Sequence, residues 1–324
     1  MLFSMLSSNA QQVHPTIGKI ISYDAAFSTI VSSDAKVEVI ASNIKWAEGP
    51  VWIKDGGYLL FSDAPRNTIF KWEEKSGLSE FLKPSGYTGL GSYSDEPGSN
   101  GLMINQTGEL VACEHGDRRV TKMNLKTGGK VELANKWHGK RFNSPNDICQ
   151  HSNGTYFFTD PPYGLPDRER DTANREIAEN GVYSILPDGT VKQIVANLKR
   201  PNGIALSSNE KTLYVSQSDG SGPYIMAYTI KKDGTVGDGR IFFDFNTVKD
   251  KLGGAAADGI KVDAKGNIYA GAANGIVVLS PEGKLLGKIE VGIQTSNCAF
   301  GANDYLYITA QRYVCRVKLL GAAR

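Results

Sequence analysis

The chain has few of the features that mark several large protein classes. Its 324 residues carry a formal net charge of only +2, and no segment concentrates Lys and Arg among aromatic residues. A nucleic-acid partner is therefore not expected. No apolar run is long enough to span a bilayer. The sequence thus predicts neither a membrane span nor a nucleic-acid interface.

Cysteine is also scarce. The four cysteines are Cys113, Cys149, Cys298 and Cys315, and they show no CxxC or CxxxC spacing. Each lies in or beside an apolar, strand-like segment. This setting predicts buried free thiols rather than metal ligands or a disulfide framework.

Glycine, by contrast, is abundant, with 36 residues. Most of these glycines fall in short clusters typical of turns. Many tight reversals favour an all-β chain over a helical one.

The first 35 residues carry none of the repeated pattern described below and are predicted to form an N-terminal tail. Residues 1–10 resemble the end of a secretion signal with a small-residue cleavage site before Gln11, but they lack a basic stretch. A truncated start and a disordered tail are the alternatives. A periplasmic or secreted location is the expectation, and a cytoplasmic one is the alternative.

The rest of the chain contains an internal repeat. Six segments begin with a short polar residue, usually followed by Gly and then by an apolar stretch, at intervals of 39 to 56 residues. The six leading residues are Glu48, Asn100, Asn146, Asn202, Asp258 and Asn297. A turn residue comes seven or eight positions later in each unit, and a second β-rich stretch follows it.

Four strands per unit, repeated radially, predict a six-bladed β-propeller of four-stranded antiparallel blades over residues 36–321. The sixth unit runs out of chain after its third strand. Residues 36–40 are the expected donor of the missing outer strand, which would close the ring and remove exposed strand edges. Two β-sandwich domains are the competing architecture, but they would not share one layout.

In a propeller the first strand of each blade lines the central channel, so the six leading residues should form a ring around the axis. All six have side-chain oxygens, two are acids, and no Lys or Arg is expected there to neutralise them. Two carboxylates held close together repel unless a cation or a proton intervenes. Oxygen ligands without imidazole or thiolate suit a hard cation, with Ca²⁺ expected first and Mg²⁺, Mn²⁺ or Zn²⁺ as alternatives. A water-filled channel is the competing interpretation.

Five segments carry a family resemblance. They read Glu48-Gly-Pro, Asn143-Ser-Pro-Asn-Asp147, Phe158-Thr-Asp-Pro161, Arg200-Pro-Asn-Gly203 and Asp258-Gly. In this order and at blade spacing, they resemble the gluconolactonase, regucalcin (senescence marker protein) and luciferin-regenerating-enzyme family, from about Ile40 to Leu319. The bacterial gluconolactonases are the most similar branch, given Cys113-Glu-His-Gly116 and Thr159-Asp-Pro-Pro-Tyr-Gly164.

The resemblance implies one divalent metal held by Glu48, Asn146, Asn202 and Asp258, and a metal-dependent lactone hydrolase acting on a gluconolactone-like substrate. One departure is the stretch Gly253-Gly-Ala-Ala-Ala257 before Asp258, where relatives often have Pro. The approach to Asp258 is therefore expected to be looser or differently shaped.

The predicted mechanism is polarisation of the lactone carbonyl by the metal and attack by water, with Asp258 as general base or purely as a ligand. An organophosphate hydrolase with the same metal site is the first alternative. A non-catalytic propeller that binds other proteins is the second. We expect a monomer or a dimer.

Further residues are expected around the site. Asn100, His115, Arg141 and Asn297 are the predicted substrate contacts, and Asp160 is expected to support the metal site from behind. The far ends of the second strands should return to the same end of the channel; they carry Asp63, Glu114, His115, Asp160, Ser216 and Gln217. Two insertions, residues 85–99 and 165–180, are expected to shape substrate access. Tyr87, Tyr93 and Tyr163 are candidates for contacts with sugar hydroxyls, with plain loop surface as the alternative.

Overall fold

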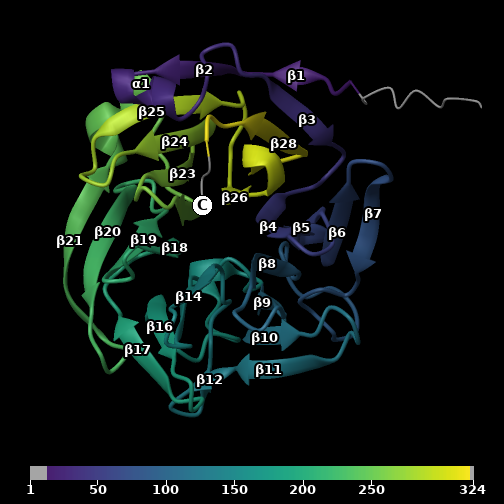
Figure 1. Cartoon of the computed structure of the whole chain (residues 1–324). Helices are drawn as coiled ribbons and strands as arrows, with labels where there is room; N and C mark the ends of the chain where they lie inside the picture. The colour runs from purple at the N-terminus through teal and green to yellow at the C-terminus, as the bar shows by residue number, and fades with distance from the viewer. Residues whose placement is uncertain (1–12, 322–324) are drawn as a thin grey trace, which may run out of the picture.

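The computed structural model describes residues 13–321, and within them six sheets of four or five strands surround a central axis (Figure 1). Each sheet is antiparallel, and its first strand lies nearest the axis. The predicted six-bladed β-propeller is therefore confirmed. The strands follow the sequence outward through each blade, because short turns join neighbours in antiparallel pairs.

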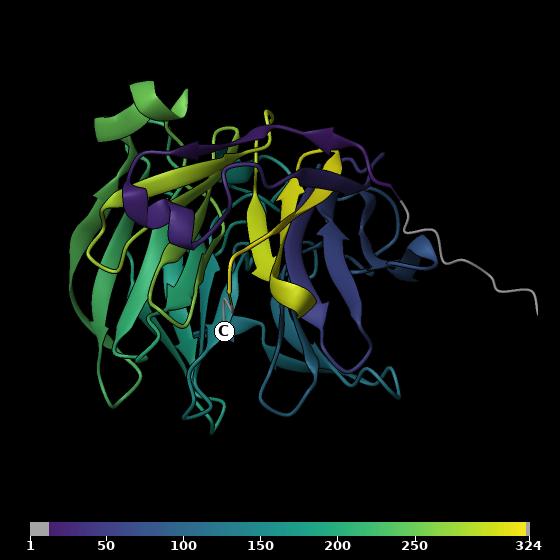
Figure 2. The same ribbon diagram turned by 45° about the horizontal axis from the view of Figure 1, so that its top comes forward.

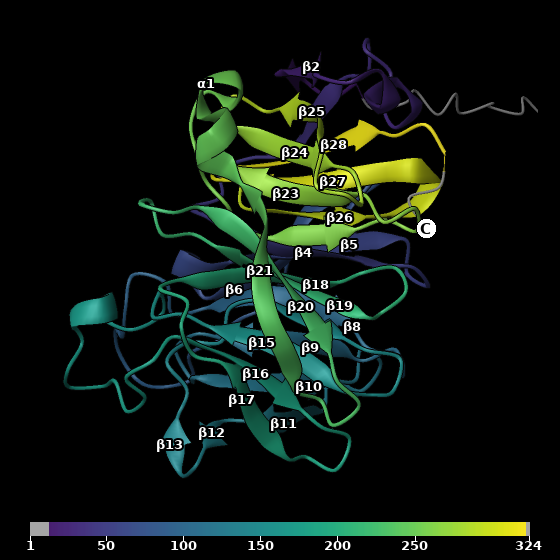
Figure 3. The same cartoon turned by 90° about the vertical axis from the view of Figure 1, so that its left-hand side faces the viewer.

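The first three blades are four-stranded sheets, and each is formed by strands that follow one another in the chain. Blade 1 consists of β4 (Ala47–Ile53), β5 (Tyr58–Asp63), β6 (Thr68–Glu73) and β7 (Gly77–Leu82). Blade 2 consists of β8 (Ser99–Ile104), β9 (Leu110–Glu114), β10 (Arg119–Met123) and β11 (Lys130–Ala134). Blade 3 consists of β14 (Ile148–Gln150), β15 (Tyr156–Asp160), β16 (Gly181–Ile185) and β17 (Val191–Val195). A small hairpin, β12 (Lys136–Trp137) and β13 (Lys140–Arg141), lies at the periphery between blades 2 and 3 (Figure 3).

The second half of the ring follows the same plan. Blade 4 consists of β18 (Pro201–Leu206), β19 (Thr212–Gln217), β20 (Tyr224–Ile230) and β21 (Val236–Asp244). Blade 5 contains β22 (Ile260–Val262), β23 (Ile268–Ala272), β24 (Gly275–Leu279) and β25 (Leu285–Glu290). Blade 6 contains β26 (Asn297–Phe300), β27 (Tyr305–Ala310) and β28 (Tyr313–Lys318), together with β3 (Val37–Ala41). Between blades 4 and 5 lies the short helix α1 (Lys249–Leu252).

The ring closes as predicted. Strand β3 pairs with β28, with Val39 opposite Cys315. The outer strand of the last blade thus comes from the N-terminal side of the chain, which ties the two ends of the propeller together.

The predicted N-terminal tail requires a correction, because part of it belongs to the propeller. Strand β1 (Thr16–Ile17) pairs with β3, and β2 (Lys19–Ser22) adds a fifth strand to blade 5 by pairing with β25. Figure 2 shows these purple strands running along the outside of the last two blades. Ile17 and Ile20 pack against the core beside the buried Phe27, which explains why the segment is ordered. The proposed signal remnant lies outside the described residues.

The core lies between blades rather than in one central cluster. Apolar side chains from facing sheets fill each interface, as in the cluster that joins blades 5 and 6 around Tyr269, Ile276 and Ile308. Cys113, Cys298 and Cys315 are buried and Cys149 is half-buried, all as free thiols, as predicted. In residues 13–321 no helix is both long enough and apolar enough to cross a membrane.

The glycine of the repeated motif has a physical cause. A side-chain carbon at Gly49 would lie 1.9 Å from the Asn100 carbonyl oxygen, and one at Gly203 would lie 2.4 Å from the Asp258 carbonyl oxygen. Each such glycine therefore lets the leading residue of the next blade approach closely. The repeated glycine in the sequence is therefore a consequence of how closely the blades pack around the channel.

Candidate functional site

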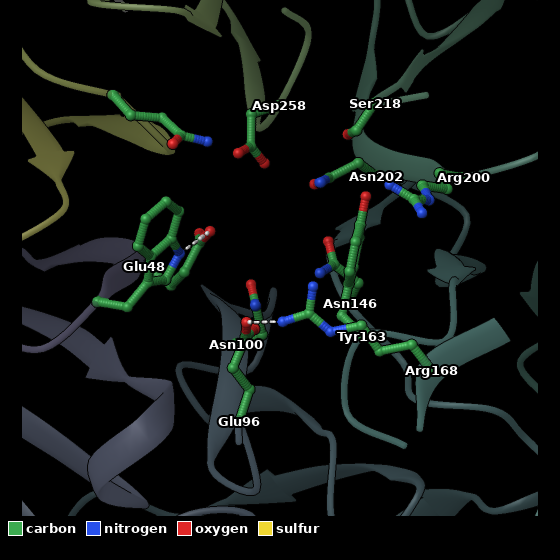
Figure 4. A pocket seen from close by; sticks show the side chains of 12 residues that line it. Glu48, Glu96, Asn100, Asn146, Tyr163, Arg168, Arg200, Asn202, Ser218 and Asp258 are labelled. Atoms are coloured by element: carbon green, nitrogen blue, oxygen red, sulfur yellow. Dashed lines mark hydrogen bonds and ion pairs between the residues drawn. The ribbon is translucent and has the colours of Figure 1, made fainter. Parts of the chain in front are cut away.

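Side chains from the starts of the inner strands meet at one mouth of the channel, around a cavity of about 430 Å³ (Figure 4). Five of the six leading residues line it: Glu48, Asn100, Asn146, Asn202 and Asp258. The four predicted metal ligands are thus brought together, and so is one predicted substrate contact, Asn100. Figure 4 shows the Glu48 and Asp258 carboxylates pointing into the same space from different blades.

Other predicted contacts lie elsewhere. Asn297 is buried and bonds Lys261 and the Cys298 N–H rather than lining the cavity. His115 is fully buried, with Nδ1 3.1 Å from the Glu96 carbonyl oxygen. Arg141 donates to the Asp117 carbonyl oxygen. Within the part of the chain that the structure describes, these three side chains are not brought into the cavity.

The Glu48 carboxylate is held in place by two donors. The Trp46 indole Nε1 donates to Oε1 at 3.2 Å, and the Gly49 N–H lies 3.2 Å from Oε2. Burial nevertheless raises the pKa of Glu48 to about 8, and the negative charge of Asp147 adds to the rise. Bringing this acid into the channel in its charged form is therefore costly without a cation.

The charged form of Asp258 is disfavoured for the same reason as that of Glu48. Burial, together with the charges of Glu48 and Asp147, raises the pKa of Asp258 well above its usual range. Its Oδ1 is buried and has no hydrogen-bond partner among the described residues, and the same is true of Asn146 Oδ1. Because buried polar atoms are nearly always paired, these two oxygens are available to a cation or to water in the cavity.

The ends of the second strands hold the loops that deliver the ligands. Asp160 accepts the backbone N–H groups of Asn143 (2.7 Å) and Ser144 (2.8 Å), which fixes the loop before Asn146. Asp63 accepts the N–H groups of Lys45 and Trp46 in the same way, ahead of Glu48. The geometry therefore places Asp160 behind the site, where its supporting role was predicted.

In blade 4, Gln217 and Ser216 also form hydrogen bonds to the backbone near the site. The Gln217 side chain accepts the Lys199 N–H at 2.8 Å, and the Ser216 hydroxyl donates to the Asp258 carbonyl oxygen at 2.6 Å. Glu114 is the exception among the strand-end residues. It accepts from Arg119, Thr121 and Lys130 within its own blade, away from the channel.

Hydroxyl groups also link neighbouring blades at the depth of the site. The Ser62 hydroxyl donates to the Asn100 carbonyl oxygen (2.8 Å), and the Thr159 hydroxyl donates to that of Asn202 (2.6 Å). With Ser216 and Asp258, these bonds fix the backbone of three leading residues from the preceding blade. The site is therefore rigid at its base.

The two insertions predicted to shape substrate access each contribute a side chain to the cavity wall. Glu96 comes from the first and Arg168 from the second, and Arg168 Nη2 lies 3.2 Å from Glu96 Oε1 (Figure 4). Tyr163 also lines the cavity, whereas Tyr87 and Tyr93 stack on each other, with ring centroids 4.9 Å apart, outside the lining.

Several lining residues were not predicted. They are Trp46, Glu96, Arg168, Arg200, Ser218 and Gln294. Trp46 lies two residues before Glu48, and Arg200 belongs to the Arg-Pro-Asn-Gly motif, so both carried a local signal in the sequence. Arg168 and Arg200 also reach the mouth, but among the described residues neither forms an ion pair with Glu48 or Asp258, so the expectation that no Lys or Arg neutralises these acids agrees with the structure.

The donor atoms in the cavity are compatible with a metal site in which all protein ligands are oxygen atoms. Within residues 13–321 no group of three or more His, Cys, Asp or Glu side chains could hold a metal, so the amide oxygens must complete any site. Two carboxylates with two amide oxygens, one of them unpaired and buried, are the ligand chemistry that hard cations prefer.

Comparisons with known proteins agree with this geometry. A family described as the SMP-30/Gluconolactonase/LRE-like region matches residues 46–312. A gluconolactonase of Zymomonas mobilis is 40% identical over 310 residues, which cover 94% of this chain and 86% of that protein.

Solved structures show the same fold. A gluconolactonase from Xanthomonas campestris has a TM-score of 0.79 at 28% identity, over 96% of this chain and 99% of that one. A regucalcin from Agrobacterium tumefaciens, described as a calcium-binding protein, has a TM-score of 0.68 at 17% identity, over 88% and 94%, a likeness of fold alone. The chain belongs to the SMP-30, gluconolactonase and luciferin-regenerating-enzyme family.

Proposed function

We propose that this chain hydrolyses sugar-type lactones and that one divalent cation, held by Glu48, Asn146, Asn202 and Asp258, takes part. The observation that carries the proposal is the pair of acids in one cavity, together with the unpaired, buried oxygens of Asn146 and Asp258. The 40% identity to the Zymomonas mobilis gluconolactonase over most of the chain supports the lactone as substrate class.

Calcium is the first ion to test. The donors are carboxylate and amide oxygens from four blades, without imidazole or thiolate, which favours Ca²⁺ over Zn²⁺. When bound, the cation would supply Lewis-acid polarisation of the lactone carbonyl.

The chain's own residues supply the rest of the chemistry. Asp258 accepts the proton of the water whose oxygen bonds to the carbonyl carbon. The ring C–O bond then breaks, and the proton passes to the departing ring oxygen, which becomes a hydroxyl group. Asp258 is the better candidate of the two acids, because Trp46 and Gly49 already donate to the oxygens of Glu48, whereas Asp258 Oδ1 has no partner among the described residues.

The cavity wall suits a polyhydroxylated ring. Trp46 and Tyr163 offer aromatic surface, while Asn100, Arg168 and Arg200 offer polar groups to substrate oxygens. A compact polar cavity with a few placed donors and acceptors is the usual form of a small-molecule site.

The decisive experiment measures lactone opening with and without a cation. The purified protein is stripped with a chelator, and hydrolysis of glucono-1,5-lactone is followed above the spontaneous rate after adding Ca²⁺, Mg²⁺, Mn²⁺ or Zn²⁺ separately. We expect activity to vanish on chelation and to return with at least one cation, while the fold, followed by circular dichroism, is retained. A folded protein that opens no lactone with any of the four ions would contradict the proposal, and an organophosphate triester in the same panel tests the alternative activity.

A further inference from the structure

A second polar layer lies beneath the site, built from Asp147, Lys261 and Asn297. Lys261 Nζ lies 3.5 Å from Asp147 Oδ2 and 3.0 Å from Asn297 Oδ1, and Asn297 Nδ2 lies 3.4 Å from Asp147 Oδ2. Asp147 and Asn297 are each 2% exposed. We call these three residues the lower layer, and the leading residues around the cavity the upper layer.

The lower layer separates two cavities. None of its three residues lines the cavity of the upper layer, whereas Lys261 lines a second cavity of about 600 Å³ together with Leu102, Ile148 and Ile204. The first cavity is lined by the starts of the inner strands and the second by their ends. The lower layer therefore lies between two cavities at opposite ends of the inner strands.

Asp147 and Lys261 are both exceptions to the repeat. One residue after the leading residue, four blades carry Gly, blade 6 carries Cys298, and blade 3 carries Asp147. Three residues after it, the other five blades carry apolar residues, and blade 5 carries Lys261; the five are Val51, Met103, Cys149, Ala205 and Phe300. The two charged exceptions, from different blades, meet each other in the channel.

The contacts of the Lys261 ammonium are those of a bound cation. Besides Asp147 Oδ2 and Asn297 Oδ1, the ammonium donates to the Ile260 carbonyl oxygen at 3.1 Å. Three oxygens, one of them a buried carboxylate, thus surround a single positive charge. Without that charge, the same oxygens would leave an uncompensated carboxylate in the channel, which is strongly unfavourable.

We propose that Lys261 is a fixed internal cation that fills the lower layer, so that only the upper layer is open to a divalent ion. This inference rests on the proposed function in one respect, because the ion of the upper layer belongs to that function. It adds that the chain limits itself to one ion, and that it does so with its own side chain.

The test counts calcium ions in chelator-stripped protein by titration calorimetry and elemental analysis. Lys261→Met keeps the length and the apolar stem of the side chain but removes its charge. We expect one Ca²⁺ per chain in the unaltered protein and two in this variant. The double variant Asp147→Asn with Lys261→Met removes the carboxylate as well and should bind one. Lys265→Met, at an exposed lysine just after the same strand, is the matched control and should also bind one.

A folded Lys261→Met protein with the same ion count and the same Kd as the unaltered chain would overturn the proposal. Should that variant not fold, Asp147→Asn alone decides the matter. It leaves the ammonium uncompensated below the upper layer, so calcium should bind there about tenfold more weakly, and an unchanged Kd would overturn the inference. If the unaltered chain binds neither Ca²⁺ nor Mg²⁺, Mn²⁺ or Zn²⁺, the proposed function fails, and one ion gained by Lys261→Met would still support the role of Lys261.

Discussion

The upper and lower layers of the channel solve the same electrostatic problem in different ways. Both bury acidic side chains from the starts of inner strands, Glu48 and Asp258 in the upper layer and Asp147 in the lower one. In the lower layer, Lys261 compensates Asp147 directly. In the upper layer, Glu48 and Asp258 have raised pKa values and no basic side chain within salt-bridge distance among the described residues. The upper layer therefore lowers the stability of the fold when no cation is bound, and strongly shifted pKa values of this kind are common at functional sites.

The largest expected effect comes from removing the proposed base. Asp258→Asn keeps a side-chain oxygen but loses the proton acceptor, so lactone hydrolysis should fall about 10²- to 10⁴-fold at saturating Ca²⁺. Steady-state kinetics combined with calcium titration measures both quantities. Turnover that survives with calcium bound would show that Asp258 is only a ligand. Asp147→Asn, in the lower layer, should lose far less activity, and equal losses would remove the distinction between the layers.

The next effect is on pH dependence. Without a cation, the raised pKa of Glu48, about 8, lies above its value of 4.5 in the unfolded chain. Between these values the folded protein holds a proton that the unfolded chain has released, so the free energy of unfolding falls as pH rises from about 4.5 to about 8. A bound cation replaces the proton and removes this fall.

Melting temperatures at pH 5 and pH 8, with chelator and with saturating Ca²⁺, measure this difference. The chelated protein should lose more stability between the two pH values than the loaded one. Calcium affinity should rise with pH below pH 8, by up to about tenfold per pH unit for each proton that the cation displaces, and Glu48 contributes one such proton. Glu48→Gln should flatten the curve of the chelated protein, and equal slopes with and without calcium would contradict the assignment.

Much of this arrangement could be predicted from the sequence, and the reason is packing. In four blades a glycine follows the leading residue, and at Gly49 and Gly203 the close approach of the next blade leaves no room for a side chain. Packing around the channel therefore produces a repeat that is visible in the sequence. That repeat placed Glu48, Asn146 and Asp258 around one axis. The closing strand followed from the unit that lacked one.

The rest could not be predicted, because the repeat fixes a strand position but not the depth or direction of a side chain. Asn297 aligns with the upper layer, yet its oxygen accepts from Lys261 and from the Cys298 N–H in the lower layer. Arg168 reaches the cavity from a long insertion without periodicity. Lys261 did leave a signal, as the one charged residue at a position that is apolar in the other five blades.

A smaller effect tests how the upper layer is held from behind. Asp160→Asn would place an amide donor near the backbone N–H groups of Asn143 and Ser144, which now bond to a carboxylate. Burying an unpaired donor costs about 1–3 kcal/mol, and calcium should also bind more weakly because the loop carries Asn146. Chemical denaturation and calcium titration measure the two effects. Asp188→Asn, at an exposed turn of the same blade, is the control, and a loss of stability without any change in calcium binding would separate Asp160 from the site.

The smallest expected effect tests the hydrogen bond between Trp46 and Glu48. Trp46→Phe keeps an aromatic ring at the cavity but removes the indole N–H, which lies 3.2 Å from Glu48 Oε1 and lowers the pKa of Glu48. Calcium should bind about tenfold more weakly at neutral pH, as is usual when a partner of a metal ligand is lost. The pH at which binding reaches half its maximal strength should also move upward. Trp52→Phe is the matched control, because Trp52 stacks on Tyr307 away from the cavity and cannot reach Glu48. If calcium affinity fell equally in both variants, Trp46 would act through general stability. A loss of affinity confined to Trp46→Phe would show that the indole N–H stabilises the charged form of Glu48, an acid that has no basic partner in the upper layer.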